Sequence, residues 1–249
     1  MLPAVMVEPT RAPTLEVRGL HKRFGRLEVL RGIDLAFAPG RVTAVVGPNA
    51  AGKSTLLKCA LGLVRPDRGE VRFEGVPVTG QHDYRRAIGF MPQRAAFPEN
   101  LTGREVLGLV HGLHSNAGEQ DEDLLHRFGL ESQLDKPVRT LSGGTRQKLN
   151  AVVAFLFRPR LIILDEPTAG LDPLASSILK EKLAELVDRG VTVVLTSHVM
   201  SEIEELAETV VFIVDGQAHF NGSMESLRRL TGEQRLERAV ARLMRARVA

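Results

Sequence analysis

The chain has 249 residues, of which 43% are hydrophobic and 25% charged, an ordinary composition for a globular protein with one large or two smaller α/β domains. It contains no apolar run near the ~18 residues that cross a membrane, and an aromatic content of 4% without Trp argues against a base-stacking nucleic-acid surface. The formal charge of +3 is uneven: the residues from Ser223 onward contribute +4, so the 222 residues before them carry −1, and a DNA-binding interpretation rests on the tail alone.

The N-terminal part of the chain predicts a leader followed by two strands. Residues 1–14 contain three prolines and neither a basic start nor a sufficient apolar segment, so we expect a flexible leader rather than a signal peptide. Apolar and polar residues alternate over residues 15–18 and again over residues 29–37, which indicates two strands. His21–Gly25 between them is expected to form a turn.

The most informative stretch follows at residues 41–62. Val42–Val46 is apolar and β-branched and predicts a buried strand, while apolar residues after residue 55 recur on one face of a helix. Between them GPNAAGKS matches G-x-x-x-x-G-K-[ST] in the required strand–loop–helix context. In such a loop backbone N–H groups and the positive helix end bind phosphate, Lys53 adds a charge for the β- and γ-phosphates, and the Ser54 hydroxyl can hold Mg²⁺. The alternative is an ordinary strand–turn–helix that happens to contain a lysine.

Two residues of this stretch carry separate expectations. Ala50 stands where such loops often have glycine, and if the position requires a positive φ, alanine costs about 1–2 kcal/mol. Cys59 is the only cysteine and lies in the apolar helix, so it cannot form an internal disulfide and is expected to be a small core residue.

The middle of the chain changes character. Residues 69–75 are typical of a hairpin strand, and residues 87–91 predict another strand, which ends at Pro92-Gln93. Helical spacing of apolar residues then dominates, and we expect an inserted helical subdomain at about residues 95–158.

Within this subdomain LSGGTRQ begins at Leu141. Ser142 is expected to cap the following helix, and Gly143 and Gly144 leave its backbone open to an anion. A simple capped helix start, with no ligand, is the alternative.

An acidic pair follows the next strand. Leu161–Leu164 predicts a buried strand, and Asp165 and Glu166 come directly after it. In a doubly wound sheet this is the edge where ligands bind. Asp165 is suited to hold Mg²⁺, usually through water, and Glu166 to act as general base. The alternative is a strand that ends in solvated acids.

The remaining segments complete an alternating pattern of a helix at residues 173–188, a strand at 191–195, a helix at 200–207 and a strand at 210–214. Such alternation implies a mostly parallel sheet covered by helices on both faces. We therefore predict an α/β fold with a P-loop NTPase core, an antiparallel β subdomain near the N-terminus and the inserted helical subdomain.

Five motifs stand together in one order: GPNAAGKST, LSGGTRQ, LIILDEP, Gly170-Leu171-Asp172 and Thr196-Ser197-His198. In order and spacing they resemble an ABC ATPase, the nucleotide-binding subunit of ABC transporters. The resemblance covers residues 15–222, which implies one ABC ATPase domain there, with the leader before it and a basic helical tail at residues 223–249. Two positions depart from the family pattern. One is Ala50, in the phosphate loop, and the other is Thr145, where the family usually has Gln after Ser-Gly-Gly.

The resemblance implies how ATP is bound. Phe24 matches the aromatic residue that stacks on adenine, although a core Phe is the alternative. Ser142, Gly143 and Gly144 match the turn that closes over ATP bound to a second copy of the chain. The phosphates are expected to contact the loop residues Gly47, Pro48, Asn49, Ala50, Ala51, Gly52, Lys53, Ser54 and Thr55.

The resemblance also implies the metal and catalytic residues. Mg²⁺ is expected to be held by Ser54, Gln93 and Asp165. Glu166, Gln93 and His198 match the catalytic residues, with His198 contacting the γ-phosphate; a solitary His after a strand is otherwise more often structural.

The implied assembly is a homodimer that powers separate integral membrane permease subunits from the cytoplasmic face of the inner (plasma) membrane, with no nucleic-acid partner. Asp172 matches the loop that crosses to the second copy. Residues 98–105 and 170–173 resemble exporter-type ATPases, and residues 226–233 resemble the ATPase of the copper-processing system in nitrous-oxide reductase maturation.

Four alternatives remain open. A catalytically idle binding or scaffold subunit is disfavoured by the intact Lys53, Glu166 and His198. A solvated basic helix that caps the domain is the alternative for the tail. An importer ATPase is close in chemistry. A soluble ABC ATPase acting on nucleic acid is disfavoured, since only 87 residues lie from Thr55 to Leu141, too few for a long coiled coil.

Overall fold

The computed structural model describes residues 12–78, 80, 82–114 and 120–245 and divides the chain into two compact units. The first unit contains residues 1–82 and 192–249, and the second contains residues 83–191. Residues 1–11 of the expected leader lie outside the described residues, whereas Thr14 is buried, with its hydroxyl 2.7 Å from that of Thr192.

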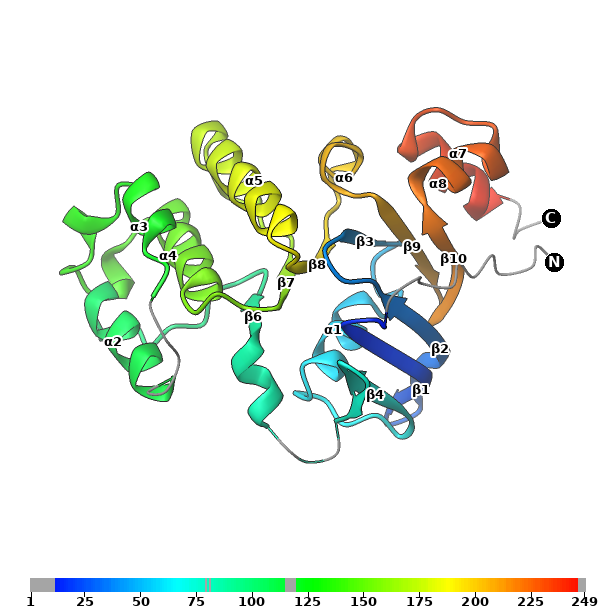
Figure 1. Ribbon diagram of the computed structural model, residues 1–249, viewed down its shortest axis with the longest axis horizontal. Helices are drawn as coiled ribbons and strands as arrows, with labels where there is room; N and C mark the ends of the chain where they lie inside the picture. The colour runs from blue at the N-terminus through cyan, green and yellow to red at the C-terminus, as the bar shows by residue number, and fades with distance from the viewer. Residues whose placement is uncertain (1–11, 79, 81, 115–119, 246–249) are drawn as a thin grey trace. The chain divides into compact units, whose positions relative to one another are not determined.

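The first unit begins with an antiparallel sheet in the strand order β2-β1-β4-β5 (Figure 1). Its strands are β1 (Leu15–Phe24), β2 (Leu27–Phe37), β4 (Arg68–Phe73) and β5 (Val76–Pro77). The predicted antiparallel β subdomain near the N-terminus is therefore confirmed.

The turn expected at His21–Gly25 is wrong. Strand β1 continues to Phe24, which pairs with Leu27 of β2, so that the turn consists of Gly25 and Arg26 alone. Register shifts interrupt the pairing of β1 with β2, and such irregularities break the period-two alternation by which a strand is identified.

The second sheet of this unit has the order β10-β9-β3-β8. Strand β3 (Val42–Val46) pairs in parallel with β8 (Thr192–Thr196) and β9 (Thr209–Val214), and β10 (Gln217–Ser223) runs antiparallel to β9. All residues of β3 and β8 are buried, as expected for parallel strands covered on both faces. The predicted parallel strands are confirmed here.

The described residues of the same unit include the helices α1 (Lys53–Ala60), α6 (Met200–Leu206), α7 (Met224–Thr231) and α8 (Leu236–Arg245). Helix α1 buries Cys59, which is 1% exposed, so the predicted core position of this cysteine is confirmed. Helix α8 lies beside α7 (Figure 1). It buries Leu236, Ala239 and Val240, while its arginine residues are exposed.

The second unit contains the parallel pair β6 (Ile88–Met91) and β7 (Leu161–Asp165). A Cβ on Gly89 of β6 would lie 2.0 Å from the carbonyl oxygen of Ala154 in α4, so glycine permits this helix to pack directly on the strand. The helices are α2 (Gly103–Leu113), α3 (Asp123–Arg127), α4 (Gly143–Phe155) and α5 (Pro173–Asp188). Short 3₁₀ turns lie before β6, at Asp83–Ala87, and between α3 and α4, at Glu131–Gln133 and Val138–Thr140.

An ion cluster that contains a buried lysine joins α3 to α5. Lys182 of α5 is 2% exposed, and its ammonium lies 2.9 Å from Asp121 Oδ2 and 3.0 Å from Asp123 Oδ2. Arg127 of α3 lies 3.0 Å from Glu185 of α5. A buried ammonium needs such partners, because an unpaired charge removed from water costs several kcal/mol.

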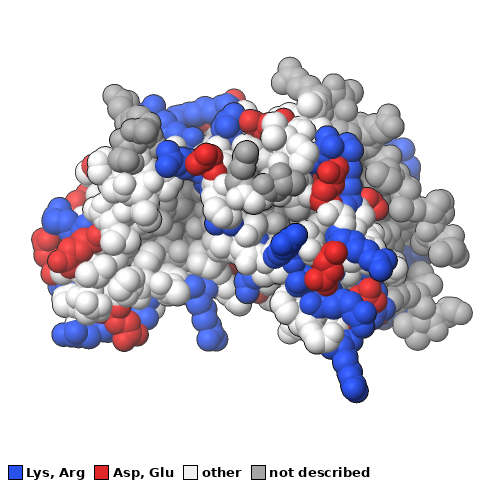
Figure 2. All heavy atoms as spheres, turned by 90° about the horizontal axis from the view of Figure 1, so that it is seen from below, with Lys and Arg blue, Asp and Glu red and all other residues white. Residues whose placement is uncertain are grey.

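Within the described ranges, none of the helices is both long and apolar enough to cross a bilayer. On the face drawn in Figure 2, Lys and Arg side chains are interspersed with Asp and Glu. This mixture agrees with the nearly balanced charge of the first 222 residues.

Candidate active site

The loop between β3 and α1 has glycine at each end because no side chain fits there. A Cβ on Gly47 would lie 2.0 Å from the carbonyl oxygen of Ile213, and a Cβ on Gly52 would lie 2.8 Å from that of Val29. Both glycines have positive φ, 155° and 103°. The strand and helix predicted on the two sides of this loop are confirmed, and α1 begins at Lys53.

The geometry of the loop suits a chain of phosphates. Lys53 Nζ donates to the carbonyl oxygens of Gly47 and Pro48 at 2.7 and 3.0 Å, so the ammonium lies over the loop. At the start of α1, Gly52 has no side chain that could compete with a ligand for the N–H groups of the first turn. The loop therefore combines a helix N-terminus with a held ammonium, and a phosphate group fits both.

Ala50 has a φ of 62°, in the left-handed region that favours glycine. The position therefore requires the positive φ on which the expected cost depended, and alanine costs about 1–2 kcal/mol here.

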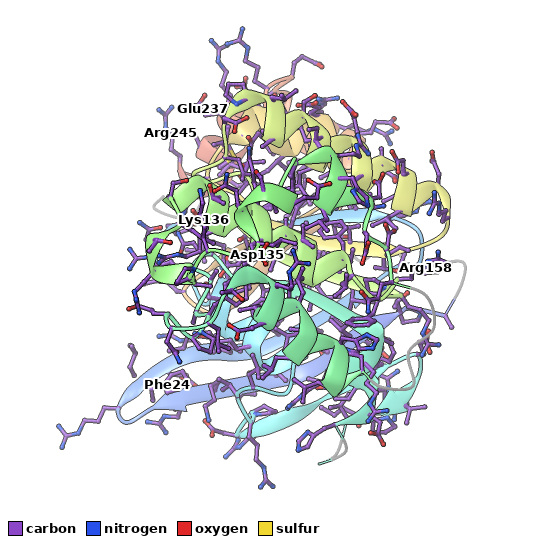
Figure 3. The ribbon with its side chains drawn as sticks, turned by 90° about the vertical axis from the view of Figure 1, so that its left-hand side faces the viewer. Phe24, Asp135, Lys136, Arg158, Glu237 and Arg245 are labelled. Atoms are coloured by element: carbon purple, nitrogen blue, oxygen red, sulfur yellow. The ribbon has the colours of Figure 1, made fainter. Side chains whose placement is uncertain are left out.

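The other predicted residues of the first unit are exposed. Phe24 ends β1 and is 50% exposed, so the alternative that it is a core residue is wrong (Figure 3). Lys22 Nζ lies over its ring, 5.4 Å from the centroid. His198 is exposed two residues after the end of β8, where the Val199 N–H donates to the Ser197 hydroxyl at 3.0 Å.

In the second unit the structure brings Gln93 and Glu166 together. Met91 of β6 pairs with Leu164 of β7, and each predicted residue stands two positions further along its chain. Gln93 Nε2 donates to Glu166 Oε2 at 3.0 Å. Glu166 has a φ of 53°, a left-handed conformation that is uncommon outside glycine and that concentrates at functional sites.

Ser142 caps α4 as predicted. Its hydroxyl accepts from the Thr145 N–H at 3.1 Å and lies 2.8 Å from the Thr145 hydroxyl. The departure at position 145 therefore adds a contact to the serine of this turn. A Cβ on Gly143 would meet nothing within 4 Å, so the backbone at the start of α4 is open to a ligand.

Two residues of α4 that the motifs do not mark connect this helix to neighbouring loops. Asn150 is buried, and its amide donates to the carbonyl oxygen of Pro92 at 2.8 Å, directly before Gln93. Lys148 Nζ lies 2.8 Å from Asp172 Oδ2, and this hydrogen bond is the main cause of the lowered pKa of Asp172. A lone Lys or Asn on a helix gives no sequence signal of such contacts, because each partner lies more than 20 residues away.

The candidate metal ligands are a hydroxyl in Ser54, a carboxylate in Asp165 and an amide oxygen in Gln93, and such hard oxygen donors suit Mg²⁺. Gln93 donates to Glu166 through Nε2, so its Oε1 is the atom that would face an ion. Among the described residues no group of three or more His, Cys, Asp or Glu is placed to hold a metal. Each of the three side chains, taken by itself, therefore offers an oxygen donor of the kind that Mg²⁺ accepts.

Comparison with known proteins agrees with this geometry. The family model described as "ABC transporter" matches residues 30–169. The chain is 36% identical over 228 residues to the "Daunorubicin resistance ATP-binding protein DrrA3" of Streptomyces coeruleorubidus, covering 90% of this chain and 72% of that protein. It is 34% identical to the "Nod factor export ATP-binding protein I" of Ralstonia nicotianae, covering 86% and 68%. A solved structure, "Structure of ATP binding subunit of ABC transporter", matches with a TM-score of 0.87 and 31% identity over 93% of this chain and 99% of that one.

Proposed function

This chain belongs to the ABC transporter family as one of its ATP-hydrolysing, ATP-binding subunits, and from this premise we propose that two copies close around ATP to power a separate membrane permease. The observation that carries the proposal is the loop from Gly47 to Gly52, with Lys53 held over it. This arrangement combines fixed positive charge with backbone donors, as triphosphate binding requires.

ATP is proposed to extend from this loop to Phe24, whose exposed ring can stack on adenine. The phosphates would contact the loop backbone and Lys53. Ser54, Asp165 and Gln93 would hold Mg²⁺, which would neutralise part of the phosphate charge.

Glu166 is proposed as the general base for the attacking water. Its hydrogen bond from Gln93 orients the carboxylate, and the left-handed backbone at Glu166 fixes the direction in which it leaves β7. His198 is proposed to contact the γ-phosphate. A positioned general base contributes about 10²–10⁴-fold to a rate, so the loss of this carboxylate alone should slow turnover by that order.

The second copy is proposed to complete each ATP site through Ser142, Gly143 and Gly144. Support comes from the exposed start of α4, where the Ser142 hydroxyl accepts from the Thr145 N–H and the space beside Gly143 is open. A helix N-terminus attracts an anion, and the γ-phosphate supplies one that ADP lacks. Hydrolysis would remove this bridge and let the two copies separate.

Export is the proposed direction of transport, since the Ralstonia relative is named for export. The permease is proposed to dock near Gln93 and the helical segment, at the cytoplasmic face of the inner membrane. The similarity of the tail to the copper-processing ATPase stays a prediction that the identity of the permease will test.

The test is a Glu166→Gln variant purified with and without its membrane partner. It should bind ATP, form dimers in size-exclusion chromatography with light scattering, and hydrolyse ATP about 10²–10⁴-fold more slowly than the wild type. Lys53→Ala is the control, because it should lose nucleotide binding and dimer formation together. Wild-type hydrolysis by Glu166→Gln would remove Glu166 from its role, and a nucleotide-loaded monomer at high concentration with the permease present would refute the dimer.

A further inference from the structure

The tip of the β1–β2 hairpin is tied to the loop that follows α1. Lys22 Nζ donates to the carbonyl oxygen of Arg65 at 2.8 Å and to Asp67 Oδ1 at 3.0 Å. Asp67 Oδ2 accepts from the Arg23 N–H at 2.6 Å, and the Asp67 N–H donates to the carbonyl oxygen of His21 at 2.8 Å. We call Lys22 and Asp67, with these four hydrogen bonds, the hairpin clamp.

The clamp is more constrained than an ordinary surface ion pair. Both carboxylate oxygens of Asp67 are used, and the hydrogen bond from Lys22 is the largest cause of its lowered pKa. The Lys22 side chain is 15% exposed, so it is largely withdrawn from solvent. By contrast, the pair of Arg18 and Glu16 joins two residues of one strand, and the Arg18 side chain is 52% exposed.

The clamp reaches the ring of Phe24. Lys22 Nζ lies over this ring, 5.4 Å from the centroid, within the range of a cation–π contact. The ammonium covers one face, while Phe24 as a whole remains 50% exposed. A planar base could therefore contact the part of the Phe24 ring that Lys22 leaves exposed.

The same loop is an extension of α1. The N–H groups of Leu63 and Val64 both donate to the carbonyl oxygen of Lys58, in the last turn of that helix. The helix begins at the phosphate loop. The hairpin tip and the phosphate loop are thus fastened to the two ends of one helix.

We propose that the Lys22–Asp67 clamp positions Phe24 for stacking on the adenine of a bound nucleotide. This inference rests on the proposed function, in which Phe24 contacts adenine. Lys22 and Asp67 act through Phe24 and touch no reacting atom, so they are positioning residues.

The experiment compares ADP, which carries the base, with pyrophosphate, which lacks it. Titration calorimetry on the full chain measures the dissociation constant of each ligand, because neither carries a γ-phosphate that the protein could hydrolyse during the titration. Lys22→Met and Asp67→Asn should raise the ADP constant about three- to tenfold and leave the pyrophosphate constant within about twofold of the wild type. Phe24→Ala should raise the ADP constant about tenfold or more.

Two controls make the comparison specific. Glu16→Gln removes an ion pair of similar length from the same strand and should change neither constant. In the Phe24→Ala background, Asp67→Asn should add no further loss of ADP affinity, since a residue that acts through the ring has no effect once the ring is absent.

Each contrary outcome has its own meaning. If Asp67→Asn weakens ADP and pyrophosphate equally, the clamp only supports the fold and the inference is overturned. If Phe24→Ala weakens ADP but Asp67→Asn does not, the clamp is overturned while the adenine contact stands. If Phe24→Ala changes neither constant while Lys53→Ala loses both ligands, the adenine contact itself is overturned and the phosphate loop retains its role.

Discussion

Replacing Ala50 by glycine should stabilise the protein. Ala50 is exposed, so its methyl group contributes little burial, and its φ of 62° costs a residue with a Cβ about 1–2 kcal/mol. Glycine removes this cost but adds about 0.4–1 kcal/mol of conformational entropy to the unfolded chain. The net gain is about 0.5–1 kcal/mol, which for a chain of this size corresponds to a rise in Tm of about 1–4 °C.

Thermal unfolding followed by circular dichroism, without nucleotide, measures this gain. Ala51→Gly is the matched control, because Ala51 is 3% exposed and is not among the residues with positive φ. The control loses a buried methyl group and gains unfolded-state entropy, so its unfolding free energy should fall by about 1–2 kcal/mol. The two neighbouring substitutions should therefore shift Tm in opposite directions.

A fall in Tm for Ala50→Gly, or equal shifts for the two variants, would refute the reasoning. Either result would mean that the backbone at Ala50 is not strained in the free protein. The departure from glycine at this position would then have no energetic consequence for folding.

Other perturbations test separate parts of the structure. Gly47→Ala should abolish ADP binding in calorimetry, because its Cβ would lie 2.0 Å from the carbonyl oxygen of Ile213; retained affinity would mean that the loop can shift. Cys59 should resist iodoacetamide at pH 8 in the native protein and react in denaturant, since burial raises the pKa of its thiol to about 11; rapid native labelling, detected by mass spectrometry, would contradict this. Lys148→Met should raise the pKa of Asp172 in an NMR titration, because the hydrogen bond from Lys148 is the main cause of its lowered value. Lys148→Met should therefore lower the free energy of unfolding at pH values above the unfolded-state pKa of Asp172, about 3.9, and this difference from the wild type should vanish as pH falls through the lowered folded-state pKa. A difference that persists in acid would show that packing, and not charge, is responsible.

The sequence allowed the phosphate loop to be located because its signals are local. Val42–Val46 is a mostly apolar run, and Gly47 and Gly52 after it mark the two ends of the loop. Buried parallel strands give such runs wherever both faces are covered. The helix at residues 173–188 was also predicted from a local signal, the amphipathic spacing of its apolar residues, and the structure has it at Pro173–Asp188.

The contacts that organise the site could not be predicted, because they join residues far apart in the chain. Asp67 lies 45 residues from Lys22, and Asn150 lies 58 residues from Pro92. A polar side chain does not indicate in the sequence which distant backbone group it will contact. The positive φ of Glu166 was equally hidden, since only glycine signals that conformation by its identity.

With Glu166 in its proposed role as general base, its left-handed backbone opposes thermal stability to turnover at a single position. Glycine adopts a φ of 53° without the penalty that a Cβ brings, yet it provides no carboxylate. A library randomised at this codon and screened only for heat resistance would therefore enrich idle proteins. The same library screened for transport would retain the acid together with its distorted backbone.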